Sequence, residues 1–142
     1  MTTEQYKRPV PVPDEVSTPF WEGCKKHELL IIRCSDCGYY IHWPKQRCPQ
    51  CWSTNVAPAK VSGRGTVYSY TIYQVEGPPG FKPPYSVVLV SLEEQEDVRI
   101  CSNLEDCPLD QIKIGMPVEV FFRDVPEEDV SIPLFRPRKG TK

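Results

Sequence analysis

The segment CSDCGYYIHWPKQRCPQC, residues 34–51, holds two Cys-x-x-Cys pairs separated by ten residues. Its four candidate metal ligands are Cys34, Cys37, Cys48 and Cys51. The two-residue gap lets each pair curl so that backbone N–H groups point at the sulfurs, and four soft sulfur ligands select zinc or, in a rubredoxin-type centre, iron. Because four cysteines close a tetrahedral shell and leave no position for water, the pattern predicts a structural metal site that replaces a hydrophobic core.

Other residues in and around this segment have simpler interpretations. Gly38 tolerates the left-handed backbone that such a curl often requires. His42 could replace a cysteine as a ligand, but four thiolates already suffice, so we expect an ordinary hydrogen-bonded histidine. Cys24, Cys101 and Cys107 have no neighbouring base, so we expect small buried hydrophobic residues. Seven cysteines, four of them in pairs, favour metal ligation in a reducing compartment over a disulfide framework.

The residues before the cysteine pairs predict an arm and a helix. Residues 1–17 include the run PVPVP, which cannot form a helix and suits an extended arm. Thr18-Pro19 has the form of a helix start, and apolar residues then recur at three- and four-residue spacing, which predicts a helix over residues 18–28. We expect this helix and the metal ribbon to form one unit over residues 18–58.

The second half of the chain has the composition of a β domain. Runs rich in Val, Ile, Tyr and Thr predict strands within residues 66–75, 85–92, 98–104 and 118–122. Gly63 and Gly65 precede the first strand, where a small barrel needs a bulge or coil. The predicted fold class is therefore mainly β, with a helix, a zinc ribbon and then a partly open barrel, of which the five-stranded OB-fold is the commonest kind. We assign the OB-fold to residues 59–126 and a C-terminal tail to residues 127–142.

Two tyrosines of the first barrel strand are candidates for a binding surface. Tyr68 and Tyr70 share one face of the strand. Exposed aromatic residues on an OB barrel can stack nucleic-acid bases, but no basic groove accompanies them and the formal net charge is −2. We therefore expect both rings to pack in the core or to line a cleft.

The sequence also argues against several functions. It lacks the phosphate-binding, dinucleotide-binding, zinc-protease and hydrolase motifs, and it has two histidines but no convincing catalytic base. We therefore expect no independent catalysis. No segment has the apolar length of a signal peptide or a membrane span, which predicts a cytoplasmic protein that does not enter a membrane.

In this order, several motifs resemble a known family. They are the CSDCG and CPQC pairs, then GRGTVYSYT, PPYSVVLV, LDQIKIGMPVEVFF and the closing PLFRP. Together they are similar to the zinc-ribbon/OB-fold acyl-CoA-associated proteins, once catalogued as a domain of unknown function. The likeness covers nearly the whole chain after residue 14. It implies a rubredoxin-like zinc ribbon, with Cys34, Cys37, Cys48 and Cys51 as ligands of a structural Zn²⁺, fused to an OB-fold.

The resemblance also implies a function. Family members are small partners of thiolase-superfamily enzymes, including acetoacetyl-CoA thiolase with hydroxymethylglutaryl-CoA synthase, steroid side-chain aldolases and benzoylsuccinyl-CoA thiolase. Several help to hold coenzyme A, while the catalytic cysteine belongs to the large subunit. We thus expect a non-catalytic subunit of a thiolase-type acyltransferase or aldolase. The alternative is a free-standing module that binds single-stranded nucleic acid.

Basic residues beside apolar ones are candidates for contact with coenzyme A phosphates or with the partner subunit. Ile132 to Phe135 form an apolar run that could anchor the expected tail, although most basic tails are simply solvated. The candidate contacts are Phe81, Lys82, Arg136, Arg138 and Lys139.

Overall fold

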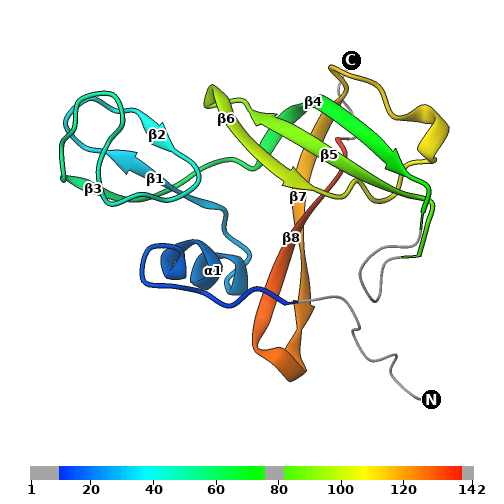
Figure 1. Cartoon of the computed structure of the whole chain (residues 1–142), viewed down its shortest axis with the longest axis horizontal. Coiled ribbons are helices and arrows are strands. Elements are labelled where there is room, and N and C mark those ends of the chain that lie inside the picture. The colour runs from blue at the N-terminus through cyan, green and yellow to red at the C-terminus, as the bar shows by residue number, and fades with distance from the viewer. Residues whose placement is uncertain (1–9, 76–81, 139–142) are drawn as a thin grey trace.

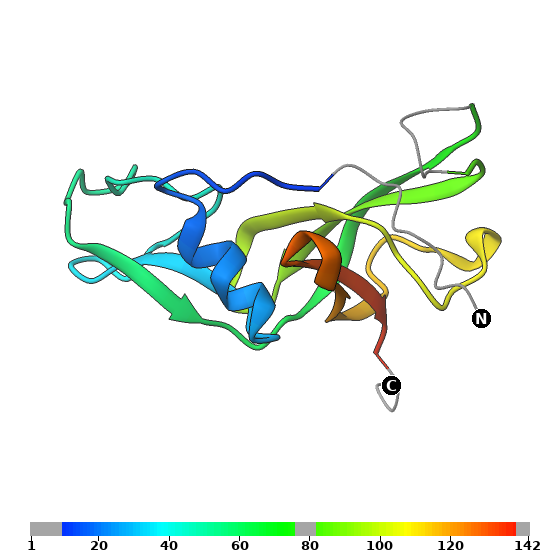
Figure 2. The ribbon, with the colours of Figure 1, turned by 90° about the horizontal axis from the view of Figure 1, so that it is seen from below.

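A computed structural model describes residues 10–75 and 82–138 (Figure 1). It contains one α-helix, a three-stranded sheet and a five-stranded sheet. In Figure 1 the small sheet lies at one end of the molecule and the large sheet at the other, and Figure 2 shows α1 running beside both. The fold class predicted from the sequence, a helix and ribbon followed by an OB-type half-barrel, is confirmed.

Helix α1 (Thr18–Lys25) begins where it was predicted and ends three residues early. The helix buries Phe20 and Cys24 against the rest of the protein. It stops because His27 adopts a left-handed backbone with φ of 59°. At eight residues α1 is short, and within the ranges 10–75 and 82–138 no helix has the length and apolar character needed to cross a membrane.

The small sheet carries the cysteine pairs. Its strands are β1 (Leu30–Cys34), β2 (Tyr40–Ile41) and β3 (Val56–Lys60), in the antiparallel order β2-β1-β3. Ile32 and Ile41 pack with two of the cysteines in a small cluster of their own. This core is too small to stabilise a domain unaided, so the ribbon needs a further source of stability.

The large sheet is a curled half-barrel of antiparallel strands in the order β6-β5-β4-β7-β8. Its strands are β4 (Arg64–Tyr73), β5 (Tyr85–Leu92), β6 (Gln95–Ser102), β7 (Pro117–Val125) and β8 (Val130–Pro137). Two short 3₁₀ turns, η1 (Leu109–Gln111) and η2 (Pro126–Glu128), lie before and after β7. A bridge between Leu104 and Phe135 links the segment after β6 to β8. The buried valines of β4 and β5 share one core with Phe20 and Cys24 of α1.

The predicted C-terminal tail is wrong over residues 130–137, because these residues form strand β8. The strand pairs with β7 along its whole length, and Leu134 and Phe135 are 2% and 0% exposed. Two prolines weaken the strand signal in the sequence, but β8 is an edge strand, where a missing N–H is tolerated. The apolar run therefore completes the barrel and is not available as an anchor on a partner.

Of the two glycines expected before the first barrel strand, Gly63 lies just before β4, whereas Gly65 lies within it and away from the bulge. A Cβ atom on Gly65 would lie 2.2 Å from the carbonyl oxygen of Ser91, and Gly63 has φ of 81°. Strand β4 can therefore approach β5 closely only with glycine at residue 65.

The two tyrosines of β4 do not lie in the core. The pairing register between β4 and β5 shifts between Val67 and Ser69, which is the signature of a β-bulge. Tyr68 and Tyr70 are 46% and 38% exposed. The expectation of core packing is therefore wrong for both tyrosines. The alternative, that they line a cleft, holds for Tyr68, which lines a shallow cleft beside Gly65.

Specific polar contacts join the ribbon to the barrel. The side-chain amide of Gln95 accepts from the backbone N–H of Tyr40 at 3.0 Å and donates to its carbonyl at 2.9 Å. The hydroxyl of Tyr39 donates to Asp97 at 2.8 Å. Because these bonds connect β2 to β6, they fix the position of the cysteine pairs relative to the barrel.

Candidate metal centre

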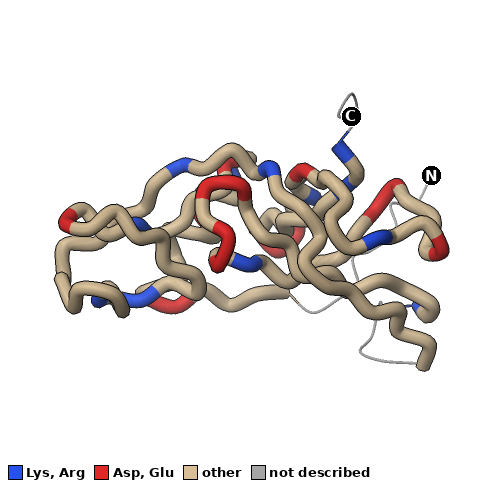
Figure 3. The backbone as a smooth tube through the Cα atoms, turned by 90° about the horizontal axis from the view of Figure 1, so that it is seen from above, with Lys and Arg blue, Asp and Glu red and all other residues tan. Residues whose placement is uncertain are grey.

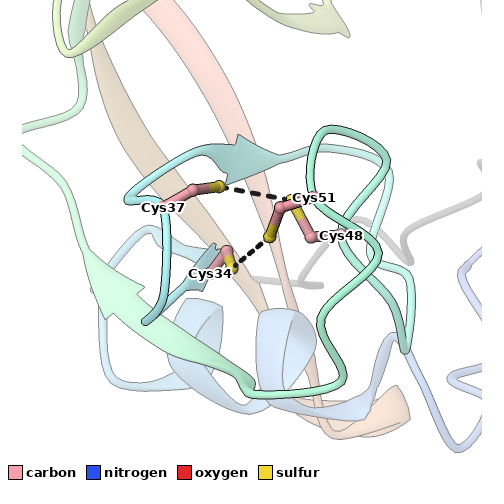
Figure 4. Close-up of side chains that lie close together, drawn as sticks. All are labelled: Cys34, Cys37, Cys48 and Cys51. Carbon is pink, nitrogen blue, oxygen red and sulfur yellow. Dashed lines mark hydrogen bonds between the residues drawn. The ribbon is translucent and has the colours of Figure 1, made fainter.

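The structure brings all four predicted cysteine ligands together (Figure 4). Cys34 ends β1 and Cys37 lies in the turn that follows, while Cys48 and Cys51 come from the loop between β2 and β3. Their sulfur atoms all lie within 4.8 Å of one another. The Cys34–Cys51 and Cys37–Cys48 sulfur separations are 3.6 and 3.5 Å.

The spacing of the sulfurs fits a tetrahedral metal. A zinc ion with Zn–S bonds of about 2.3 Å places its sulfur ligands about 3.8 Å apart. Within the part of the chain that the structure describes, this is the one group of three or more histidine, cysteine or acidic residues with such a geometry. The donor set of four thiols is that of a closed, structural centre.

Both cysteine pairs adopt the same turn. The N–H of Gly38 donates to the carbonyl of Cys34 at 2.9 Å, and the N–H of Trp52 donates to that of Cys48 at 2.9 Å. Both Gly38 and Trp52 have a positive φ, 82° and 65°. The role predicted for Gly38 is confirmed, whereas the equivalent role of Trp52 was missed because a bulky residue does not signal a left-handed backbone.

The electrostatics of the cluster favour a cation. The backbone N–H of Cys37, and then that of Asp36, lower the pKa of Cys34 to about 7. The N–H of Ser53 favours the thiolate of Cys51, but burial and the neighbouring thiols together raise the pKa of Cys51 to about 12. Four thiolates at this spacing repel one another unless a positive charge lies between them.

Asp36 connects the two halves of the ribbon. Its carboxylate accepts hydrogen bonds from the hydroxyl of Ser53 and, at 3.4 Å, from the side-chain amide of Asn55. The carbonyl of Ser53 accepts from the N–H of Cys48, and that of Asn55 accepts from the N–H of Ser35. Asp36 therefore holds the second cysteine pair, through its flanking loop, against the first.

Replacing Asp36 by alanine should loosen metal binding without abolishing it. Removing a group that supports the ligands from outside typically lowers metal affinity 10–100-fold. We expect a loss near the lower end of that range, about tenfold, because the carboxylate acts through Ser53 and Asn55, while the backbone N–H of residue 36 that faces Cys34 is kept in the variant. Competition with a chromogenic zinc chelator measures the change. Asp110→Ala, a change at an exposed residue of η1, is the matched control, and equal affinity of the two variants would contradict the role of Asp36.

His42 lies outside the cluster and is not an ordinary hydrogen-bonded histidine. Its Nδ1 is buried without a hydrogen-bond partner among the described residues, and its ring stacks on Trp43 with centroids 4.5 Å apart. Burial lowers the pKa of His42 to about 4, so the ring is neutral at pH 7.

The three remaining cysteines differ in burial. Cys24 is fully buried, as predicted, and burial raises the pKa of its thiol to about 12. Cys107 is partly buried, whereas Cys101 is exposed on β6, so the prediction of a buried residue is wrong there. The alternation within β6 could have placed Cys101, because Val98 and Ile100 are buried and Cys101 shares the opposite face of the strand with Arg99.

The basic candidates for ligand or partner contact do not form one cluster. Arg136 is paired with Glu119 at 3.0 Å, and Arg138 lies 3.7 Å from Glu93. Lys82 is exposed just before β5. The other two candidates, Phe81 and Lys139, lie outside the described residues.

The pairing register separates Lys82 from the two arginines. β5 begins opposite Tyr73, at the end of β4, whereas Arg138 bonds to Pro117, which pairs with Thr66 near the start of β4. Seven residues of strand span about 23 Å at 3.3 Å per residue. Lys82 and Arg138 would therefore contact different parts of a ligand or of a partner.

Both halves of the chain match known domain families. Residues 21–57 match the rubredoxin-like zinc ribbon domain of ChsH2, and residues 59–123 match the C-terminal OB-fold domain of ChsH2.

Curated relatives fall into three groups. The chain is 32% identical to a DUF35 domain-containing scaffold protein of Methanocaldococcus jannaschii, over 81% of this chain and 82% of that protein. It is 36% identical to benzoylsuccinyl-CoA thiolase subunit BbsA of Thauera aromatica, over 56% and 54%. It is 35% identical to a probable enoyl-CoA hydratase alpha subunit of Thermomonospora curvata over 92% of this chain, but it spans only 40% of the length of that protein.

A solved structure shares the whole architecture. A chain of the Ltp2-ChsH2(DUF35) aldolase superimposes with a TM-score of 0.82 at 34% identity, over 90% of this chain and 98% of that one. With both domain matches in the same order, the chain belongs to the ChsH2/DUF35 family, whose members join a rubredoxin-like zinc ribbon to an OB-fold.

Proposed function

We propose that this chain is a non-catalytic, zinc-containing subunit of a thiolase-type acyl-CoA enzyme complex. The observation that carries the proposal is the likeness, along nearly its whole length, to a chain of the Ltp2-ChsH2(DUF35) aldolase. The similarity to a benzoylsuccinyl-CoA thiolase subunit supports the same class of partner. The chain would stabilise the large subunit and help to form its acyl-CoA site.

The zinc would be structural. Cys34, Cys37, Cys48 and Cys51 would hold one Zn²⁺, which would fix the turn after β1 against the loop before β3. With all four positions filled by sulfur, the ion would offer no site to a substrate. We retain residues 18–58 as the ribbon unit and extend the OB unit from residue 59 through β8.

The side chains of this chain give further support for a non-catalytic role. The thiol of Cys24 is buried with a pKa raised to about 12, so it is protonated and inert at neutral pH. Cys101 is exposed, but no hydrogen bond to a base activates it among the residues described. The reacting groups would therefore belong to the large subunit.

Contact with coenzyme A would involve the basic residues at the ends of β4. Arg136 and Arg138 at one end, or Lys82 at the other, would meet phosphates or the partner surface around them. Because both arginines already face a carboxylate, a phosphate would have to compete with Glu119 or Glu93.

The alternative function is binding of single-stranded nucleic acid. Exposed Tyr68 and Tyr70 on the OB sheet are the observation in its favour. Acidic and basic residues are interspersed over the backbone in Figure 3, without a continuous basic stripe among the residues drawn in colour. Because phosphate neutralisation supplies most of such affinity, the charge distribution favours the first proposal.

Co-expression tests the proposal. The chain should co-purify with a thiolase-superfamily subunit encoded in its native host, and that subunit should be insoluble or impaired when it is produced alone. Mixing or co-expression should restore acyl-CoA turnover, and the isolated chain should show none. A chain without residues 1–13 should assemble more weakly while keeping its zinc, since Val12 is an exposed apolar residue outside the ribbon. Turnover by the isolated chain, or full activity of the large subunit without it, would overturn the proposal.

A further inference from the structure

A second candidate site lies where the ribbon meets the barrel. A cavity of about 420 Å³ opens between α1, the loop after β2, and strands β5, β6 and β8. Its walls are mainly apolar and include Phe20, Trp43, Leu89 and Ile132. Cavities of this size at the junction of two structural units are typical of small-molecule sites.

One wall of this junction cavity is aromatic. The rings of Phe20 and Trp43 meet edge to face with centroids 5.6 Å apart, and Trp43 also stacks on His42. The indole of Trp43 is 55% exposed, although a tryptophan is usually largely buried. The contacts hold the indole in place while leaving much of its surface open, so it can receive a flat apolar ring.

The polar part of the lining includes Arg99, Ser102 and Asn103, and the side chains of Ser102 and Asn103 already donate to backbone carbonyls. Arg99 is the one charged residue among those that line it, because His42 is neutral at pH 7. Its guanidinium lies 3.9 Å above the ring of Tyr68, and within the described ranges it has no carboxylate at ion-pair distance. Its Nε is buried and without an acceptor. A buried donor without a partner is costly, so this arginine favours a ligand that brings an oxygen acceptor.

We propose that the junction cavity binds a small molecule with an apolar ring that bears a carboxylate or carbonyl oxygen. The ring would lie against Trp43 and Phe20, and the oxygen would accept from the guanidinium of Arg99, which would turn from the ring of Tyr68 toward the cavity. All of these groups belong to this chain, so the site exists with or without a thiolase partner.

Calorimetric titration of the full-length, zinc-loaded chain tests the site. The probes are 2-naphthoate and its methyl ester, which separate a free carboxylate from an esterified carbonyl. At least one should bind with a stoichiometry of one. Trp43→Ala should weaken that binding about tenfold, and Arg99→Met should weaken it about five- to tenfold, because each removes one principal contact.

Trp52→Ala is the matched control. Trp52 is also an exposed tryptophan of the ribbon, but it does not line the cavity, so its loss should change affinity less than about twofold. Zinc content and far-UV circular dichroism should match the parent for all three variants. Absence of binding of both probes, or equal affinity of the Trp43 and Trp52 variants, would overturn the proposal. So would a Trp43 variant that binds the probe normally but fails to assemble with a large subunit, since the cavity would then receive a protein segment.

Discussion

Replacing Cys48 by serine should empty the metal centre and unfold the ribbon while the barrel remains folded. Cys48 is fully buried among the four sulfurs, and a serine hydroxyl is a poor ligand for zinc at neutral pH. Structural zinc contributes on the order of 10–16 kcal/mol of apparent binding free energy in small metal-stabilised domains. Without the metal, the ribbon would be stabilised mainly by a small hydrophobic cluster of its own, centred on Ile32 and Ile41, which is too small to offset the loss.

Metal analysis and limited proteolysis measure this effect together. The parent should contain one zinc per chain, and the Cys48→Ser protein should contain close to none. New cleavage should appear between β1 and β3, while a fragment that begins near residue 59 resists digestion. Cys101→Ser is the control, because this exposed cysteine lies outside the cluster and should leave zinc content unchanged. A full zinc content in the Cys48→Ser protein would contradict the assignment of Cys48 as a ligand. A visible colour typical of iron–sulfur ligation in the parent would show that the bound metal is iron and not zinc.

The ribbon could be predicted from sequence because its determinants are local. Two Cys-x-x-Cys pairs fix the ligands, and Gly38 marks the turn after the first pair. The turn after the second pair has the same hydrogen bonds but carries Trp52, so its shape follows from the metal-binding loop and not from the propensity of the residue. At this turn the Cys-x-x-Cys spacing indicates the left-handed backbone, whereas the residue type of Trp52 does not.

The barrel was predictable in kind but not in extent. Alternating β-branched and aromatic residues located β4, β5 and β7, because strand propensity and burial agree in them. The outward position of Tyr68 depends on a bulge against β5, which is set by pairing and not by the local sequence. The cavity beside Trp43 likewise depends on five elements that are distant in the chain, so no local pattern could indicate it.

Strand β8 is the clearest case of tertiary structure overriding a local signal. Its prolines and its place near the end of the sequence indicate a tail, yet Phe135 is fully buried. The N–H of Phe135 donates to the carbonyl of Asn103 at 3.1 Å, and its carbonyl accepts from Glu105 at 2.8 Å. The ring belongs to the core that the barrel shares with α1. The residue therefore links the closing strand of the barrel to the helix of the ribbon unit.

Replacing Phe135 by alanine should lower the free energy of unfolding by about 3–5 kcal/mol, since a buried phenylalanine leaves a cavity that its neighbours fill only partly. Small domains have a total stability of roughly 5–15 kcal/mol, so the variant should be close to the limit of folding. Urea denaturation at saturating zinc measures the change. Phe121→Ala is the matched control, because Phe121 lies on the paired strand, only partly buried, with its ring 5.3 Å from the guanidinium carbon of Arg136. The Phe121→Ala change should lower the free energy of unfolding by about 1 kcal/mol. If both variants cost the same, residues 130–137 behave as a tail and not as the closing strand of the barrel.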